Sequence, residues 1–173
     1  MARHHETART QSARGVFQGT GEALKHPQRR TIMAVRTADA EWRGALKDGT
    51  GRIKTESGAL DGPYSFRSRF ESDTGTNPEE LIAAAHAGCF SMALANALAS
   101  AGHPAERVST TAKVHLDKAP GGFAIGRIDL VCEAEVPGLD EAGFKAQAED
   151  AKANCPVSKA LAATEITLTA TLV

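Results

Sequence analysis

One stretch of the sequence, residues 78–101, limits what this chain can fold into. After Glu80 it contains no charged residue and no proline, and it is rich in alanine. Asn77 can cap a helix, Pro78 suits the first helical position, and Glu80 lies three residues after the cap. Gly102 provides a stop at the other end. The stretch therefore predicts one helix about 36 Å long at 1.5 Å per residue.

A helix that is apolar on nearly every side has to be covered on nearly every side. A membrane span is the competing interpretation. It is weakened by His86 and Asn96 within the run and by the mild hydrophobicity of alanine. We therefore expect a core helix. One small sheet covers one side of such a helix, so we predict a homodimer in which a second chain supplies the missing cover.

The composition fits a folded domain with a short extension. The 173 residues have a formal net charge of −1, which argues against a general nucleic-acid-binding role. Residues 1–32 hold six Lys/Arg against two acidic residues and few large apolar groups, so we expect a disordered basic extension before a domain at 33–173. A transit peptide is the alternative for this extension. Three cysteines without a secretory signal predict a cytoplasmic protein rather than a disulfide framework.

Alternation of apolar and polar residues predicts six strands around the long helix. Three strands in a row before the helix predict an antiparallel meander. After the helix, the apolar parity of a long strand slips near Gly126, which predicts a β-bulge. Asp140 and Pro156 mark the starts of two further helices. The result is an α+β domain with strands at 41–47, 52–60, 64–71, 108–116, 123–136 and 165–172.

The three cysteines predict different roles. Cys132 lies on the apolar parity of a strand, which is typical of a small core residue. Cys155 precedes Pro156 at the start of a short helix, where free N–H groups and the helix dipole favour a thiolate. Cys89 lies in the middle of the apolar helix. From the residues alone, Cys155 is the better candidate for a thiol of low pKa, and Cys89 needs help from another element.

His86 lies three residues before Cys89, so the two side chains are neighbours on the helix. The imidazole could serve as a base for the thiol, or it could be a hydrogen-bonded structural residue in a tight interface. A zinc site is the third interpretation, but this His-x-x-Cys pair lacks two further ligands at any usual spacing.

A buried thiolate needs a fixed positive partner. Arg67 and Arg69 lie on the polar face of the strand predicted before the helix, and a solvated face is the alternative explanation. Glu79 lies ten residues before Cys89, about 15 Å along the same helix, so the two cannot touch within one chain. If both serve one site, Glu79 comes from another chain or acts through an arginine.

Two cysteine-centred motifs carry a resemblance. They are TNPEEL at 76–81 with AHAGCFSMAL at 85–94, and CPVS at 155–158. From about residue 33 to its end, the chain resembles the OsmC/Ohr family of bacterial hydroperoxide-reducing proteins. His86 and the CPVS motif resemble the OsmC branch, because the Ohr branch usually has Tyr before its first cysteine and CPYS around its second.

The resemblance implies an OsmC-like fold in which an antiparallel sheet wraps around a long central helix in an intertwined homodimer. It implies a peroxidase of the osmotic and oxidative stress response. Cys89 would attack an organic hydroperoxide or hydrogen peroxide, Cys155 would form a disulfide with it, and Arg69 and Glu79 would polarise the site. No metal or other cofactor is implied. An external dithiol, such as a dihydrolipoyl protein, would reduce the disulfide, and neither nucleic acid nor membrane is an expected partner.

Two other functions stay open. A redox sensor would use the same thiol pair without turnover, although the sequence shows no DNA-binding or signalling module. A ligand-binding scaffold on the same fold is the other alternative, because fold does not fix function. The residues and the resemblance also differ on the leading cysteine, which is Cys155 by helix-end chemistry and Cys89 by family pattern.

Overall fold

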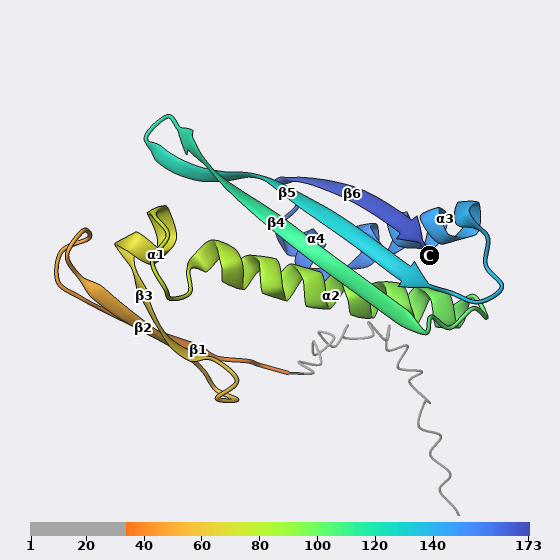
Figure 1. The fold of residues 1–173 in the computed structure, drawn as a ribbon, viewed down its shortest axis with the longest axis horizontal. Coiled ribbons are helices and arrows are strands. Elements are labelled where there is room, and N and C mark those ends of the chain that lie inside the picture. Colours follow the sequence, from red (N-terminus) through yellow and green to blue (C-terminus); the bar gives the residue numbers. More distant parts are fainter. Residues whose placement is uncertain (1–33) are drawn as a thin grey trace, which may run out of the picture. The chain divides into compact units, whose positions relative to one another are not determined.

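The structure is a computed structural model that describes residues 34–173. The chain divides into two units, 1–35 and 36–173, and every helix and strand described lies in the second (Figure 1). The predicted extension at 1–32 lies outside the described residues. The elements are β1 (Ala38–Arg43), β2 (Thr50–Thr55), β3 (Asp61–Ser65), α1 (Phe66–Phe70), α2 (Pro78–Ser100), β4 (Arg107–Ala119), β5 (Gly122–Glu135), α3 (Glu141–Asn154), α4 (Pro156–Ala160) and β6 (Glu165–Leu172).

Strands β1, β2 and β3 form an antiparallel sheet in sequence order, so the predicted meander is confirmed. The predicted bounds of its first two strands are shifted. β1 ends at Arg43 because the chain turns at Gly44, which has φ 92°. The indole Nε1 of Trp42 donates to the Gly44 carbonyl at 3.1 Å and holds this turn.

The predicted strand at 64–71 is wrong, because β3 ends at Ser65 and α1 follows directly. The hydroxyl of Ser65 accepts from the amide of Ser68 at 3.0 Å, and the hydroxyl of Ser68 accepts from the amide of Ser65 at 2.9 Å. This reciprocal capping box starts a helix. Phe66 and Phe70 fit either structure, since side chains four apart also share a helix face, and their ring centroids lie 4.8 Å apart.

The long helix is confirmed as α2. The side chain of Asn77 accepts from the amide of Glu80 at 2.8 Å, as the capping pattern predicts. Its buried side is made by Glu79, His86, Phe90, Leu94 and Leu98. The expected cover on nearly all sides is absent within the described part of the single chain, because an opposite stripe is exposed: Ala84, Ala85, Gly88, Met92, Ala95, Asn96 and Ala99.

By length and composition alone, α2 is the one helix among residues 34–173 that could cross a membrane. A core helix of a soluble protein passes the same test. Buried residues make up 22% of its most apolar window, and the other residues of the helix are partly or fully exposed in the single chain.

Strands β4, β5 and β6 form the second sheet in that order. β4 and β5 are antiparallel, whereas β6 runs parallel to β5, so this sheet is mixed rather than purely antiparallel. The predicted bulge is confirmed, because Leu116 pairs with Ile125 and His115 pairs with Arg127, which leaves Gly126 out of the register. The α+β class is confirmed, with two three-stranded sheets and one long helix.

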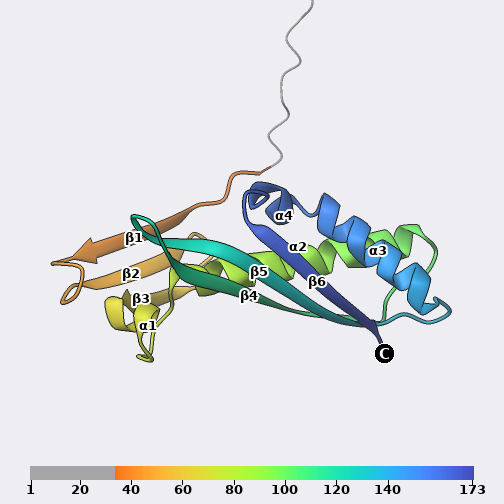
Figure 2. The ribbon, with the colours of Figure 1, turned by 90° about the horizontal axis from the view of Figure 1, so that it is seen from above.

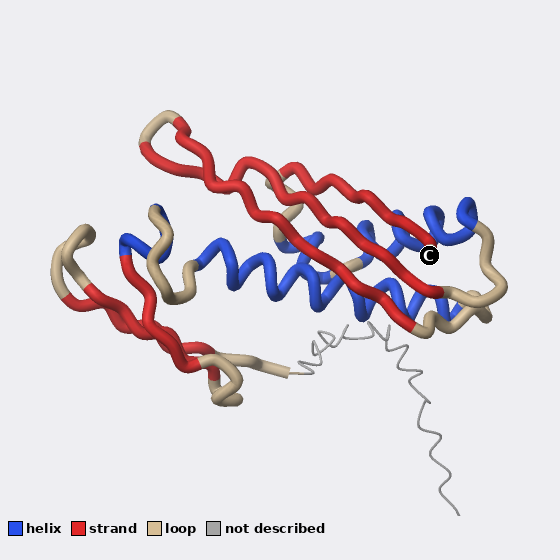
Figure 3. Tube along the Cα trace, in the orientation of Figure 1, coloured by secondary structure: helices blue, strands red, loops and turns tan. Residues whose placement is uncertain are grey.

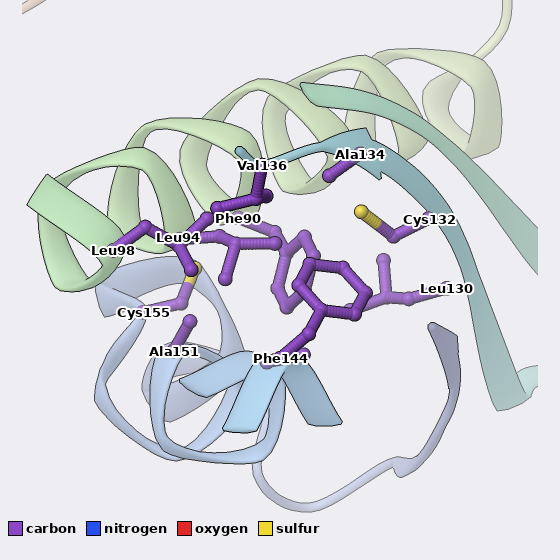
Figure 4. Packing of buried hydrophobic residues seen from close by; sticks show 11 residues of the cluster. Phe90, Leu94, Leu98, Leu130, Cys132, Ala134, Val136, Phe144, Ala151 and Cys155 are labelled. Atoms are coloured by element: carbon purple, nitrogen blue, oxygen red, sulfur yellow. The ribbon is translucent and has the colours of Figure 1, made fainter. Parts of the chain in front are cut away.

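Helices α2, α3 and α4 pack together, with α2 against β4 and α3 against β6 (Figure 2). Strands β4 to β6 thus form one layer and these helices the other (Figure 3). Asp140 caps α3 and Cys155 occupies the cap position of α4, both as predicted. Phe144 of α3 points toward Leu130 and Cys132 of β5 in the core (Figure 4). The buried position predicted for Cys132 is therefore confirmed.

Candidate functional site

The structure brings two of the predicted site residues together as a pair of thiols. Cys89 on α2 and Cys155 at the cap of α4 are 66 residues apart in sequence, and their Sγ atoms are 3.0 Å apart. Both are free cysteines. A disulfide bond is about 2.05 Å long, so closing this pair needs a movement of about 1 Å.

The two thiols differ in exposure and acidity. Cys155 has no exposed surface, whereas Cys89 is partly exposed. Burial and the hydrogen bond with Cys155 raise the pKa of Cys89. Burial also acts to raise the pKa of Cys155, but hydrogen bonds from Cys89 and from Ser158 and the Val157 amide outweigh it, so this pKa is lowered. The lowered pKa of Cys155 agrees with its position at a helix start.

The other two predicted residues form a second pair at the start of α2. Arg69 Nη2 binds Glu79 Oε1 at 2.7 Å, and Nε binds Oε2 at 3.1 Å. The Glu79 side chain is 11% exposed and that of Arg69 is 35% exposed. Glu79 lies about 15 Å along the helix from Cys89, so one chain does not unite this ion pair with the thiol pair.

Arg69 reaches Glu79 because α1 turns it toward the first turn of α2. It does not share a strand face with Arg67, as the strand prediction required. Arg67 instead pairs with Glu71 at 3.1 Å and Asp73 at 3.3 Å in an exposed cluster. Arg67 therefore pairs within a solvated cluster, whereas Arg69, although also exposed, is fixed by the nearly buried Glu79.

His86 is fully buried, and its Nε2 lies 2.8 Å from the hydroxyl oxygen of Ser158 on α4. Burial lowers the pKa of His86, so the imidazole is neutral. The hydrogen-bonded interpretation is thus confirmed. Within residues 34–173, no three His, Cys, Asp or Glu side chains are grouped to hold a metal ion. Sequence reasoning missed Ser158, although its place three residues after the cap in the CPVS motif was the available signal.

An aromatic pocket of about 430 Å³ lies beside the ion pair. Arg69 and Pro78 line it together with residues of the first sheet and α1: Trp42, Gly44, Leu46, Tyr64, Ser65, Phe66 and Phe70. Apart from the guanidinium, this lining is mostly apolar. The pocket thus offers an apolar surface next to a fixed positive charge.

Residues 71–171 match the sequence profile of the family described as OsmC-like protein. The chain is 54% identical to Peroxiredoxin OsmC of Escherichia coli (strain K12) over 130 residues, which are 75% of this chain and 90% of that protein. The chain belongs to the OsmC family. Identity to Organic hydroperoxide resistance protein OhrB of Bacillus subtilis (strain 168) is 32%, over 74% of this chain and 91% of the relative.

A solved OsmC-family structure shares the fold. It is a crystal structure from Legionella pneumophila described as an organic hydroperoxide resistance protein OsmC. It matches with a TM-score of 0.60 and 27% identity, and the match covers 80% of this chain and 98% of that one. The predicted family and fold are confirmed, and the higher identity to OsmC than to OhrB agrees with the predicted OsmC branch.

Proposed function

We propose that this OsmC-family protein is a thiol-dependent peroxidase, which reduces organic hydroperoxides to alcohols and hydrogen peroxide to water. The observation that carries the proposal is the 3.0 Å separation of the Cys89 and Cys155 sulfurs. Two thiols at this distance can lose two electrons and close a disulfide without rearranging the helices that hold them. The names of the relatives, Peroxiredoxin OsmC and Organic hydroperoxide resistance protein, agree with this chemistry.

The reaction has two oxidative steps. The Cys89 thiolate attacks the outer oxygen of the hydroperoxide, the O–O bond breaks, and Cys89 becomes a sulfenic acid while the alcohol leaves. The Cys155 thiolate then attacks the Cys89 sulfur, the hydroxyl leaves as water, and a disulfide forms. Cys155, whose sulfur lies 3.0 Å from that of Cys89 and whose pKa is lowered, can accept the Cys89 proton as the first step begins.

Among residues 34–173, no cation of the same chain acts on Cys89, so we propose that the active site is completed in a homodimer. The exposed stripe of α2 supports this arrangement: it carries no charge, consists mainly of Ala and Gly, and includes Met92 with 76% of its surface exposed. A second copy packed there would cover the apolar face. Its Arg69–Glu79 pair would then approach Cys89 and favour the thiolate.

The pocket beside Arg69 suits the organic part of a hydroperoxide. Its aromatic lining favours an apolar group, and the guanidinium favours the polar peroxide end. In this proposal the substrate is an organic hydroperoxide first and hydrogen peroxide second. A dihydrolipoyl protein or another dithiol in the cytoplasm returns the disulfide to two thiols.

The decisive experiment measures hydroperoxide consumption by the full chain with cumene hydroperoxide and dihydrolipoamide. We expect many turnovers per protein molecule. A single turnover that no dithiol reductant can renew would support the redox-sensor alternative, and no oxidation of Cys89 would support the ligand-binding scaffold. Mass spectrometry after one equivalent of cumene hydroperoxide should show a Cys89–Cys155 disulfide.

A further inference from the structure

The buried contact between His86 and Ser158 has a fixed direction. His86 Nδ1 is buried and has no hydrogen-bond partner among the described residues. An unpaired buried donor costs more than an unpaired lone pair, so the proton of the neutral ring belongs on Nε2. Nε2–H therefore donates to the Ser158 hydroxyl oxygen at 2.8 Å. A hydroxyl that accepts from His86 keeps its own proton free to donate elsewhere.

The Cys155 sulfur is the group next to Ser158 that can accept this proton. Ser158 lies in the first turn of α4, whose cap is Cys155. Hydrogen bonding from the Ser158 amide and hydroxyl contributes to lowering the pKa of the Cys155 thiol. The Val157 amide adds another donor. The hydrogen bond from His86 Nε2–H to Ser158 Oγ thus joins α2, three residues before Cys89, to α4, three residues after Cys155, and leaves the Ser158 hydroxyl proton free for the Cys155 sulfur.

We propose that Ser158 and His86 are positioning residues, which hold the sulfur of Cys155 as the leaving group when an external thiol attacks Cys89. This inference rests on the proposed function, because it concerns reduction of the Cys89–Cys155 disulfide. It assigns Cys89 as the sulfur that the reductant attacks and Cys155 as the sulfur that leaves.

The difference in solvent exposure between Cys89 and Cys155 determines which sulfur an external reductant can attack. Cys155 has no exposed surface even in one chain, and a second chain can only cover the protein further. Cys89 is partly exposed and has to be open to a hydroperoxide. A thiolate of the reductant therefore bonds to Cys89 Sγ, the S–S bond breaks, and Cys155 leaves as a thiolate. The second thiol of the reductant then attacks the reductant sulfur that is bonded to Cys89. Cys89 is released as a thiolate, and the reductant leaves with an internal disulfide.

The charged side chains near Cys155 on α3 and α4 have other partners. Lys152 binds Glu149 at 2.8 Å, and Lys159 donates to the side-chain oxygen of Asn154 at 3.2 Å. Asp150 accepts from the Asn154 amide at 3.0 Å. On α2, the titratable groups that face α4 are Cys89 and His86 itself. The groups that donate to the Cys155 sulfur are thus the neutral Ser158 and Val157 groups. The hydrogen bond from His86 orients the Ser158 hydroxyl among them.

The first test follows reduction of the oxidised full chain by dithiothreitol, with acid quenching at successive times. Ser158→Ala and His86→Leu should each slow reduction roughly tenfold, the effect expected for one hydrogen bond to a charged sulfur. Ser158→Thr keeps a hydroxyl, and His86→Gln places an amide N–H near the position of Nε2, so both should stay within about threefold of wild type. Reduction of Ser158→Ala at the wild-type rate would overturn the proposal.

A second readout separates this role from a purely structural one. In a Cys89→Ser, Cys132→Ala background, the thiolate absorbance of Cys155 is titrated with and without Ser158→Ala. The alanine variant should raise the Cys155 pKa by about one unit. An unchanged titration with intact thermal unfolding would show that Ser158 only supports packing.

A third readout needs no variant. Oxidised wild-type protein is treated with a monothiol, 2-mercaptoethanol, then quenched with acid and digested. The adduct should lie on Cys89, and an adduct on Cys155 would contradict the assignment. If no Cys89–Cys155 disulfide forms with peroxide, the proposed function fails instead.

Discussion

Arg69 and Glu79 bind each other at two points, 2.7 Å and 3.1 Å, across the junction between α1 and the first turn of α2. The carboxylate is nearly buried, so the guanidinium that neutralises it is held in one orientation. An arginine fixed in this way can present its charge to a neighbouring molecule without being drawn into solvent. This property is what a peroxide site assembled between two chains requires.

Replacing Arg69 with methionine should affect both stability and reaction rate. It leaves the Glu79 carboxylate buried without a partner, so we expect a loss of about 2 kcal/mol in the free energy of unfolding. Oxidation of Cys89 by cumene hydroperoxide should slow roughly a hundredfold, because a fixed charge at the reacting sulfur is lost. Urea unfolding and stopped-flow oxidation measure the two effects.

Arg67→Met is the matched control for Arg69→Met. Its ion pairs are exposed, so the free energy of unfolding should change by less than about 0.5 kcal/mol. Its oxidation rate should equal that of wild type. Equal losses in the two variants would mean that general surface charge, and not the Arg69–Glu79 pair, supports the reaction.

Exchange of each cysteine for serine should separate their roles. Cys89→Ser should consume no hydroperoxide. Cys155→Ser should complete one oxidation and stop with a sulfenic acid at Cys89, which dimedone labels and mass spectrometry locates. If Cys155→Ser abolishes the first oxidation and Cys89→Ser retains it, the lower pKa of Cys155 marks the leading thiol and the roles are reversed.

A large side chain at Gly88 should disrupt the proposed dimer and leave the single chain intact. A Cβ atom built at Gly88 meets no atom within 4 Å, so leucine fits the fold of one chain. We expect wild type to sediment as a dimer at micromolar concentration and Gly88→Leu to shift toward one chain. Ala146→Leu, on the exposed face of α3, is the control and should not change the mass.

Cys132→Ala should test whether the third cysteine takes part in the chemistry. Cys132 is fully buried between strand neighbours of the core, and burial raises its pKa. The smaller side chain should cost about 1 kcal/mol in the free energy of unfolding. Hydroperoxide consumption should be unchanged. A disulfide that contains Cys132 after mild oxidation would instead place it in the active chemistry.

Long periodic elements were predictable, while local exceptions to the period were not. The uncharged run of α2 and the strict alternation of β6 specify their structures over many residues. The prediction of a strand at 64–71 failed because each of Ser65 and Ser68 accepts a hydrogen bond from the other's backbone amide, and this local capping outweighs a three-residue apolar alternation. The expectation of an antiparallel sheet was wrong for β6, which runs parallel to β5. Strand direction depends on the path of the whole chain and not on the residues of one strand.

The site was predictable to a similar extent. The helix-start position was enough to predict the direction of the Cys155 pKa shift, because the Ser158 and Val157 hydrogen bonds are local, although the largest lowering contribution comes from Cys89, 66 residues away. Its closeness to Cys89 and the pairing of Arg69 with Glu79 join distant parts of the sequence, and only the family resemblance grouped them. Ser158 was missed because its place in the CPVS motif marks the residue but not its role, which depends on His86, 72 residues away in the sequence.

The complete burial of Cys155 also determines where oxidative damage can accumulate. A peroxide molecule from solution cannot reach a sulfur that has no open surface, so sulfinic and sulfonic acids can form on Cys89 and not on Cys155. In the proposed cycle, each sulfenic acid at Cys89 would have a thiol 3.0 Å away that converts it to a reducible disulfide. Under a high peroxide concentration, the working lifetime of the protein then depends on the rate of disulfide formation relative to the rate at which a second peroxide oxidises Cys89.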